Sequence, residues 1–483
     1  EDKKEIQELC AQYKKFLISH CIKRMNMMTN HLRRCHAKAV VDRVRVGILS
    51  APEVRVRFSG EYVCNIYLGG DVVETFTVAA KECALTIADL KNGDCIEYVP
   101  KNEQECYFEL QNVEIGTDFH WQEQYTLSYR GILEVRKKSD DNLQVINNLY
   151  IEEYIRSVIG SEMAPTCPLE LLKAHAIISR TWLVSQLQRK ARSQHPFYKK
   201  AKLKIFDDEM IQIWDAMGHS DFDVCSDDHC QRYQGLNQDV TGNVNEAINE
   251  TAGMILKSGG EVCDARFSKC CGGISEKFST CWTDEDYNYL TPVRCNAESS
   301  NDINHTGDPV GLKEWVKNPP TDVYCATKDY TILSRVLKAY DQKTTEDMFR
   351  WSVTYTREEL TALIKEKIGV DVGKVVELRP VEMGKSGRIS RLDIIGTLGH
   401  KVIGKELLIR RALSKTHLLS SAFYVEKSFD GTTEHFTLYG AGWGHGVGLC
   451  QVGAAVMAEK GFSYTDIQNH YYPNSEITKI SKL

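Results

Sequence analysis

The sequence predicts a mixed α+β protein that is rich in strands and contains a few core helices. Hydrophobic residues make up 42% and charged residues 26% of the 483 positions, which is a globular composition. Short runs alternate between apolar and polar residues from Val44 to about Val145, as strands do, and a helical pattern follows from Ile151 to Leu187. Strands and helices therefore occur in separate blocks rather than in regular βαβ alternation.

The same patterns divide the chain into three parts. Residues 1–42 are charged and place apolar residues on one helical face, so we expect a helical N-terminal extension. Residues 43–140 are expected to form a β-rich lobe, because residues 44–48 and 54–58 alternate between apolar and polar and glycine-containing turns punctuate the strands. Residues 141–483 are expected to form the main domain.

Within the main domain the elements are predicted one by one. One helical face carries Ile151, Tyr154, Ile155, Val158 and Ile159. Pro168 suits the first position of a second helix, which runs towards Leu187. Residues 358–367 predict a short helix, and residues 376–410 carry strand signals. Residues 296–325 are rich in Asn, Asp, Gly and Pro, so we expect a long loop or an insertion there.

Charge and cysteine content narrow the classes of function. A net charge of −6 argues against sequence-independent nucleic-acid binding, which needs a dense basic surface. No apolar run is long enough to span a bilayer, and the chain begins at Glu1 without a signal-peptide pattern, so that a signal has either been removed or never existed. Seventeen cysteines, scattered from Cys10 to Cys450, favour free thiols with one metal site over a disulfide scaffold.

Glu162 is the candidate catalytic acid/base. It lies in the segment from Gly160 to Pro165, between two helices with apolar faces. A carboxyl that is partly desolvated at such a junction would have a raised pKa, as a general acid working near neutral pH requires. The alternative is a glutamate that caps a helix or forms a salt bridge, and the local sequence by itself favours this alternative.

A glycine-rich segment is the second candidate. Residues 440–448 alternate glycine with other residues, and a helix follows that ends near Gly461. No Lys-Ser or Lys-Thr pair follows at the position that a phosphate-binding loop needs, so a nucleotide site is not indicated. We expect a tight loop that presents His445 and Gln451 to a groove; the alternative is a glycine-rich strand corner with no ligand.

Four residues form a candidate metal site. Two thiols and two imidazoles, from His219, Cys225, His229 and Cys230, suit tetrahedral zinc. Their spacing matches no common zinc finger, although a loop can wrap one ion at this spacing. The adjacent pair Cys270 and Cys271 is a rival source of ligands.

Five segments in order resemble signatures of the SpoIID/LytB family, which comprises stage II sporulation protein D and the amidase enhancers. They are residues 147–163, 172–182, 267–273, 386–388, and 442–454 continued through 470–473. The resemblance extends over most of the chain. It implies a SpoIID-like catalytic domain, to which residues 43–140 add an N-terminal β-rich lobe.

The resemblance also implies an activity, a lytic transglycosylase acting on peptidoglycan glycan strands without stem peptides. Glu162 would cleave the bond between N-acetylmuramic acid and N-acetylglucosamine and leave an anhydromuramic end. We expect substrate contacts from the following residues: Arg180, Ser268, Gly272, Gly273, His445, Gln451 and Tyr471. Some relatives carry a zinc site of His/Cys make-up beside the glycan groove, and the cluster at 219–230 is similar to it.

The resemblance further implies a cell-envelope or periplasmic location and a cell-wall amidase as a partner, while the thiol-rich chain leaves a cytoplasmic location open. Two other functions stay open. The chain could be a glycan-binding enhancer of an amidase without activity of its own, or a zinc-dependent hydrolase, for which four ligands leave no open position. The transglycosylase hypothesis requires Glu162 in an accessible groove, and a sealed, charge-paired Glu162 would contradict it.

Overall fold

The computed structural model describes residues 43–480 apart from short gaps. The gaps are residues 80–81, 92, 118–121, 139–140, 194–203, 206–207, 214–218, 237–241, 298–306, 339–340 and 342–346. The helical extension predicted over residues 1–42 lies outside the described residues. The described part is mixed α+β and strand-rich, as the sequence predicts.

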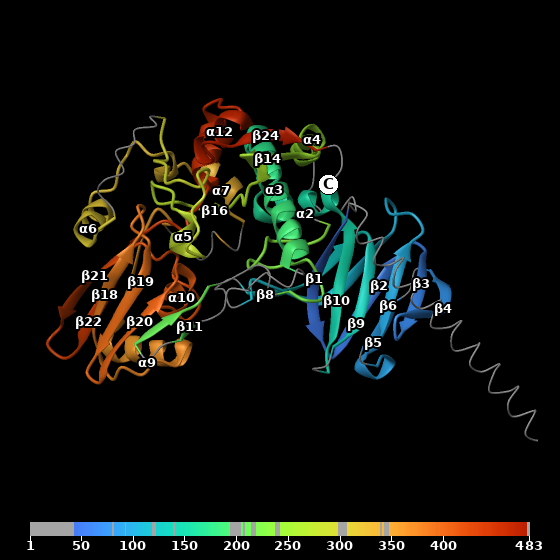
Figure 1. The fold of residues 1–483 in the computed structure, drawn as a ribbon, viewed down its shortest axis with the longest axis horizontal. Coiled ribbons are helices and arrows are strands. Elements are labelled where there is room, and N and C mark those ends of the chain that lie inside the picture. Colours follow the sequence, from blue (N-terminus) through green and yellow to red (C-terminus); the bar gives the residue numbers. More distant parts are fainter. Residues whose placement is uncertain are drawn as a thin grey trace, which may run out of the picture. The chain divides into compact units, whose positions relative to one another are not determined.

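Two sheets contain the predicted β-rich lobe (Figure 1). The larger has the order β13 (Val224–Cys225), β1 (Arg43–Ala51), β10 (Leu143–Tyr150), β9 (Ile132–Lys137), β6 (Cys95–Pro100), β3 (Tyr62–Leu68) and β4 (Asp71–Val78). The smaller has the order β5 (Glu82–Thr86), β2 (Glu53–Ser59), β7 (Tyr107–Ile115) and β8 (Glu123–Tyr129). In β2 the apolar residues are buried and the charged ones exposed, so the predicted alternation is confirmed.

The larger sheet extends across residue 140. Strand β10 lies between β1 and β9 and is antiparallel to both. Residues 43–140 and the start of the main domain therefore share one sheet, which is continuous from β10 into the helix that carries Glu162.

Helix α2 (Ile151–Glu162) follows β10 directly, and α3 (Leu169–Ser193) follows after a short turn (Figure 1). The predicted apolar face of α2 is buried, from Ile151 to Ile159, and Glu162 is its last residue. Helix α4 (Gly242–Glu250) packs on both helices. Burial of three helix faces against one another fixes the end of α2 in position.

Two further sheets consist mainly of strands from the C-terminal half of the chain. One has the order β11 (Lys204–Ile205), β12 (Glu209–Ile211), β20 (Gly399–Gly404), β19 (Ile389–Gly396) and β18 (Val375–Met383), and the other β17 (Arg350–Thr356), β22 (Glu434–Ala441) and β21 (Phe423–Phe429). Helix α9 (Arg357–Ile368) confirms the helix predicted over 358–367, and it begins with a capping box between Thr356 and Glu359.

The remaining helices and strands are mostly short. They are β14 (Met254–Ser258), β15 (Glu261–Val262), β16 (Phe267–Ser268), β23 (Leu449–Cys450), β24 (Glu476–Lys479), α5 (Phe278–Cys281), α7 (Tyr330–Val336), α11 (Gln451–Glu459), α12 (Tyr464–Tyr471), and the 3-10 turns η1 (Ile87–Asp89) and η3 (Tyr324–Ala326). Strand β16 pairs in parallel with β23, through Phe267 with Leu449 and Ser268 with Cys450. This pairing joins two of the segments that resemble the family.

Two predictions about elements were wrong. The insertion at 296–325 contains helix α6 (Pro309–Lys317), whose start is capped by the Asp308 carboxylate with Pro309 in the first turn. Residues 406–412 form helix α10 (Glu406–Ala412) rather than continuing the predicted strands. Burial of Leu408, Ile409 and Ala412 in the core of the adjoining sheet stabilises α10 as a helix.

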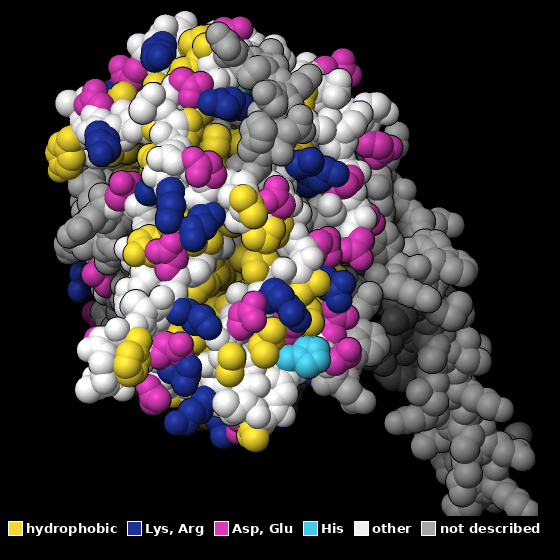
Figure 2. Space-filling view, turned by 90° about the vertical axis from the view of Figure 1, so that its left-hand side faces the viewer, with side chains coloured by type: hydrophobic (Ala, Val, Ile, Leu, Met, Phe, Trp, Pro, Cys, Tyr) yellow, Lys and Arg dark blue, Asp and Glu magenta, His cyan; other side chains and the backbone are white. Residues whose placement is uncertain are grey.

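On the face drawn in Figure 2, Lys and Arg side chains are interspersed with Asp and Glu side chains around hydrophobic ones. This face therefore carries charge of both signs rather than a uniform basic field. Among the residues that the structure describes, no helix combines the length and apolar character needed to cross a bilayer.

Candidate functional site

Three groups surround the Glu162 carboxylate at the end of α2. The Lys269 ammonium lies 3.5 Å from Oε2 and also donates to the Glu162 carbonyl oxygen at 2.7 Å. The Gln451 side-chain amide donates to Oε2 at 3.4 Å, and the Arg232 backbone N–H donates to Oε1 at 3.4 Å. These partners come from three distant segments of the chain, so the carboxylate is held by the tertiary fold rather than by its own helix.

Burial and charge oppose each other at Glu162. Burial by itself raises the pKa of this carboxyl, but the charges of Lys269 and Arg232 outweigh it and hold the pKa below its usual value. Both cations also face the buried Asp341, at 3.7 Å from Lys269 and 3.3 Å from Arg232. The prediction of a raised pKa for Glu162 was wrong, because the sequence pattern shows the apolar neighbours but not the cations that the fold brings from elsewhere.

A buried hydrogen-bond chain orients the Gln451 amide. Its nitrogen lies 3.0 Å from His175 Nε2, and His175 Nδ1 lies 3.2 Å from the Ser179 hydroxyl. Burial lowers the pKa of His175 to about 4, so the ring is neutral at pH 7 and its Nε2 can accept from the amide. The two protons of the Gln451 amide therefore point at His175 and Glu162, and Glu162 is supplied with a fixed neutral donor.

Glu162 lines a cavity of about 400 Å³, a size typical of ligand pockets. Its side chain is only 7% exposed, yet it forms part of the wall, so Glu162 is neither sealed in a core nor widely open. Aromatic side chains form other parts of the wall and include Trp182, Phe267, Trp282 and Trp443. The wall also carries several cations, among them Arg266, Lys269, Arg410 and Arg411.

Several polar atoms of residues on this wall have no hydrogen-bond partner among the described residues. They include the Ser268 hydroxyl and the side-chain carbonyl oxygens of Gln231 and Gln451. Buried polar groups normally have partners, so these atoms fit a ligand that is rich in hydroxyl and amide groups. Ser268 and Gln451 were predicted as substrate contacts, and the structure places both on the wall of the cavity that Glu162 lines.

His445 also lines the cavity and packs edge-on against Trp282 at a ring distance of 4.8 Å. Burial, with the nearby cations Arg266 and Arg388, lowers the pKa of His445 well below its usual value, so the ring is neutral. Its Nδ1 accepts the Val447 backbone N–H at 3.0 Å, which leaves the proton on Nε2. His445 is therefore a neutral ring that hydrogen bonds to the backbone of Val447 and Phe267 hold on the cavity wall.

The glycine-rich segment positions His445 through its backbone. Gly442, Gly444, Gly446 and Gly448 all have φ between 72° and 91°, a region that other residues rarely adopt. At Gly446 a side chain would also collide with the buried Arg388 guanidinium, which donates to the carbonyl oxygens of neighbouring turns. The alternating glycines thus allow the loop to wrap closely around Arg388.

Four predicted substrate contacts lie away from the cavity wall. Arg180 is fully buried, and its guanidinium binds the Glu152 carboxylate at 2.7 and 2.8 Å. Gly272 and Gly273 form a buried turn with positive φ beneath Trp315. Tyr471 is also fully buried, with its hydroxyl 3.1 Å from the Cys295 sulfur. Packing contacts account for each of these side chains and turns, and a role for the four residues in substrate binding stays a prediction.

Sequence reasoning missed Lys269, Arg232 and His175. Lys269 and His175 both lie inside segments that resemble the family, so inspection of charged residues there could have found them. Arg232 gives no such signal, because only the fold brings it to Glu162. Asp228 was missed as well; it lines the cavity and accepts from Arg232 at 2.7 Å, and burial raises its pKa to about 6.

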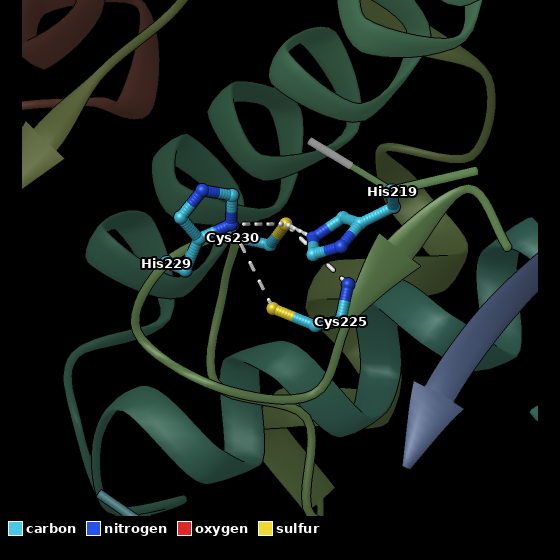
Figure 3. Close-up of side chains that lie close together, drawn as sticks. All are labelled: His219, Cys225, His229 and Cys230. Carbon is cyan, nitrogen blue, oxygen red and sulfur yellow. Dashed lines mark hydrogen bonds between the residues drawn. The ribbon is translucent and has the colours of Figure 1, made fainter. Parts of the chain in front are cut away.

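The four predicted metal ligands converge on one point (Figure 3). The Cys230 sulfur lies 3.5 Å from His219 Nε2 and 3.6 Å from His229 Nδ1, and the Cys225 sulfur lies 3.9 Å from His229 Nδ1. Bond lengths to zinc imply a sulfur–nitrogen separation of about 3.6 Å in a tetrahedral site. These residues could hold one metal ion, and His229 and Cys230 also line the cavity.

Comparisons with known proteins indicate the family. A family model described as stage II sporulation protein matches residues 139–257, which contain Glu162 and the four metal-ligand candidates. A domain of unknown function (DUF8618) matches residues 276–448.

Three curated proteins are similar to the chain. Stage II sporulation protein D of Bacillus amyloliquefaciens and that of Bacillus subtilis (strain 168) are each 25% identical to it; both alignments span 70% of this chain, with 77% and 76% of those proteins. The amidase enhancer of Bacillus subtilis (strain 168) is 23% identical over 67% of this chain and 40% of its own length. The matched model and these relatives, together with the five signature segments, support the SpoIID/LytB family for this chain.

Proposed function

We propose that the protein is a lytic transglycosylase that cleaves peptidoglycan glycan strands, with Glu162 as its single acid/base. The observation that carries the proposal is the position of Glu162, on the wall of a cavity and between two fixed proton donors, Lys269 and Gln451. The relatives named for sporulation protein D and for amidase enhancement support a role on the cell wall. We also propose a cell-envelope location, where that substrate lies.

One carboxyl is enough for this reaction. The protonated Glu162 gives its proton to the glycosidic oxygen as the bond from N-acetylmuramic acid to N-acetylglucosamine breaks. The ionised Glu162 then accepts the proton of the muramic acid's own primary hydroxyl, whose oxygen bonds to the anomeric carbon. Lys269 and Gln451 stabilise the carboxylate between the two steps. The attack is intramolecular, so no second carboxylate has to activate water.

Glu162 must gain a proton when substrate binds, because its pKa is low in the free protein. Muramic acid without its stem peptide carries a free carboxylate. On the cavity wall this carboxylate would compete with Glu162 for Lys269, one of the cations that keep Glu162 ionised, and it would raise the Glu162 pKa. The cationic wall therefore favours peptide-free strands as the substrate.

The remaining wall fits an amino sugar. The aromatic side chains offer flat apolar surfaces to sugar rings, and the unpaired polar atoms of Ser268, Gln231 and Gln451 can bind hydroxyl and acetamido groups. These contacts are expected to orient the scissile bond at Glu162.

We further propose that His219, Cys225, His229 and Cys230 hold one zinc ion, because their atom separations fit a tetrahedral site. Four protein ligands leave no open position, so the ion would cross-link the loop rather than activate a water molecule. Gln231 and Arg232 follow the last ligand directly, and Arg232 donates to Glu162. The ion would therefore keep this wall of the cavity in place.

Replacing Cys225 by Ser together with His229 by Ala tests the zinc site. Metal affinity at this site is expected to fall by more than about 100-fold, because even loss of an outer hydrogen-bond partner costs about 10–100-fold. Metal content per chain, measured by mass spectrometry, should drop by one ion, with weaker glycan binding. A Cys83→Ser variant serves as the control, because Cys83 is not one of the four proposed ligands. Unchanged metal content in the double variant would contradict the assignment.

Replacing Lys269 by Met tests how the Glu162 pKa is set. Cleavage requires protonated Glu162, and the protonated fraction falls tenfold for each pH unit above the pKa. Loss of the cation leaves burial as the dominant effect, so the pKa rises. The falling limb of kcat/KM against pH is therefore expected to move to higher pH by about one unit or more.

A Lys269→Arg variant is the matched control, because it keeps the charge and should leave the limb near its wild-type position. The result is the pH at which kcat/KM falls, because either substitution can also change the maximum value of kcat/KM. Coincident limbs in wild type and Lys269→Met would show that Lys269 does not control Glu162.

One observation favours a second candidate, a glycan-binding enhancer of a cell-wall amidase. Glu162 is mostly buried, ionised and next to Lys269, as a purely structural glutamate would be. Incubation of peptide-free glycan strands with the protein, followed by mass analysis, separates the candidates. Anhydro-ended fragments support the transglycosylase. Retained glycan binding without fragments, combined with stimulation of an added amidase, supports the enhancer.

A further inference from the structure

A second group of cysteines lies inside the core of the protein. Cys271, Cys295, Cys325 and Cys450 are all buried, and their four sulfur atoms lie within 4.8 Å of one another. They come from four separate segments: the turn after β16, the loop before the insertion, the turn η3, and the start of α11. All four are free cysteines. Four thiols from such distant segments would not be expected to converge on one point by chance packing.

The spacing fits a single tetrahedral ion. The Cys271 and Cys325 sulfur atoms are 3.7 Å apart. With zinc–sulfur bonds of about 2.3 Å, the edge of a zinc tetrathiolate is about 3.8 Å. A cluster of several irons also needs room for inorganic sulfide between the thiolates, which the 4.8 Å limit on all separations does not leave.

Polar groups around the sulfur atoms suit thiolates rather than thiols. The backbone N–H groups of Cys271 and Gly453 point at the Cys450 sulfur, at 3.2 and 3.4 Å. The Tyr471 hydroxyl lies 3.1 Å from the Cys295 sulfur and would donate to it. Such donors commonly surround metal-bound thiolates and stabilise their charge.

A cation also lies beside the group. The Arg350 guanidinium donates to the carbonyl oxygen of Gly272, the residue that follows Cys271, at 3.1 Å. Four thiolates around a zinc ion carry a net charge of −2, so a neighbouring cation lowers the cost of burying them.

We propose that Cys271, Cys295, Cys325 and Cys450 form a four-thiolate site for a single structural zinc ion, separate from the His/Cys group at residues 219–230. On binding, each thiol gives its proton to solvent and its sulfur bonds to the ion. Tyr471 acts as a hydrogen-bond donor to this site.

The site would join the insertion to the catalytic cavity. Cys295 and Cys325 bracket the insertion, and the Tyr324 N–H donates to the Cys295 carbonyl oxygen at 2.6 Å, so its two ends meet at the ion. Cys450 immediately precedes Gln451, and Cys271 is two residues from Lys269. The ion would therefore hold in place the two side chains that donate to Glu162, from behind the cavity wall.

Zinc X-ray absorption of the purified full chain tests the proposal without any substitution. If both sites are filled, native mass analysis should show two zinc ions per chain, and the average zinc should have three sulfur ligands and one nitrogen. If only the four-thiolate site is filled, one zinc with four sulfur ligands is expected. One zinc with two sulfur and two nitrogen ligands, iron in place of zinc, or no metal would overturn the proposal.

A matched pair of variants assigns the ion to its residues. Cys295→Ser together with Cys325→Ser should lose one zinc per chain, whereas Cys263→Ser, which removes another fully buried cysteine, should lose none. Should the double variant fail to fold, the Cys225→Ser/His229→Ala variant gives the same information. This variant should retain one zinc with sulfur ligands alone. If the purified variant contained no metal, the proposal would be overturned.

Discussion

Replacing Glu162 by Gln is expected to reduce glycan cleavage by about 10²–10⁴-fold, the usual contribution of general acid–base catalysis. The amide is nearly the same size as the carboxyl, so the cavity and its contacts with Gln451 and Lys269 should persist. It has no proton to give to the glycosidic oxygen and no charge with which to take one back. Anhydro-ended fragments formed per minute from peptide-free strands measure the loss.

The control for this variant is Glu153→Gln. Glu153 lies on the same helix as Glu162 but is not among the residues that line the catalytic cavity, and it pairs with Arg156 at 3.4 Å. The chemical change is identical, so wild-type cleavage is expected. Equal cleavage by Glu162→Gln and wild type would remove Glu162 from the mechanism, even if both proteins cut glycan.

Replacing Glu152 by Gln is expected to lower the free energy of unfolding by about 3 kcal/mol, because it leaves a buried charge without its partner. Arg180 has a fully buried side chain, and its guanidinium is held by the Glu152 carboxylate. That pair ties the first turn of α2 to α3, at the opposite end of α2 from Glu162. Chemical denaturation of the full chain measures the change.

Glu61→Gln provides the matched control, since the pair between Glu61 and Lys101 is exposed and such pairs contribute at most about 1 kcal/mol. Cleavage per folded molecule should stay at the wild-type level in both variants. If Glu152→Gln kept its stability but lost glycan binding, Arg180 would be a substrate contact rather than a purely stabilising residue.

The sequence predicted local secondary structure and local motifs better than the tertiary surroundings of individual side chains. Periodicity located α2 and α9, and the residue types at 219–230 predicted a metal site whose four side chains do converge. Both inferences depend on short stretches, in which neighbours along the chain are also neighbours in space. The helix α6 was missed because the polar composition of the insertion concealed its Asp308–Pro309 start.

The environment of Glu162 could not be predicted in this way. Its pKa depends on Lys269 and Arg232, which only tertiary contacts bring to it, and the apolar residues beside it in sequence predicted the opposite shift. The same holds for Cys295 and Cys325, which match no spacing motif and meet Cys271 and Cys450 only in the folded chain. Arg180 is the opposite case. It lies within a segment that resembles the family, but its buried position indicates that it stabilises the fold.

The most direct test of the account is cleavage of peptide-free glycan strands in water enriched in oxygen-18. The proposed reaction closes the muramic acid's own hydroxyl onto its anomeric carbon, so the new ends should be lighter than hydrolysed ends by one water molecule and carry no heavy oxygen. Glu162→Gln should give no such ends. Fragments that incorporate heavy oxygen at the new end would contradict the account, because water and not the internal hydroxyl would then be the attacking group.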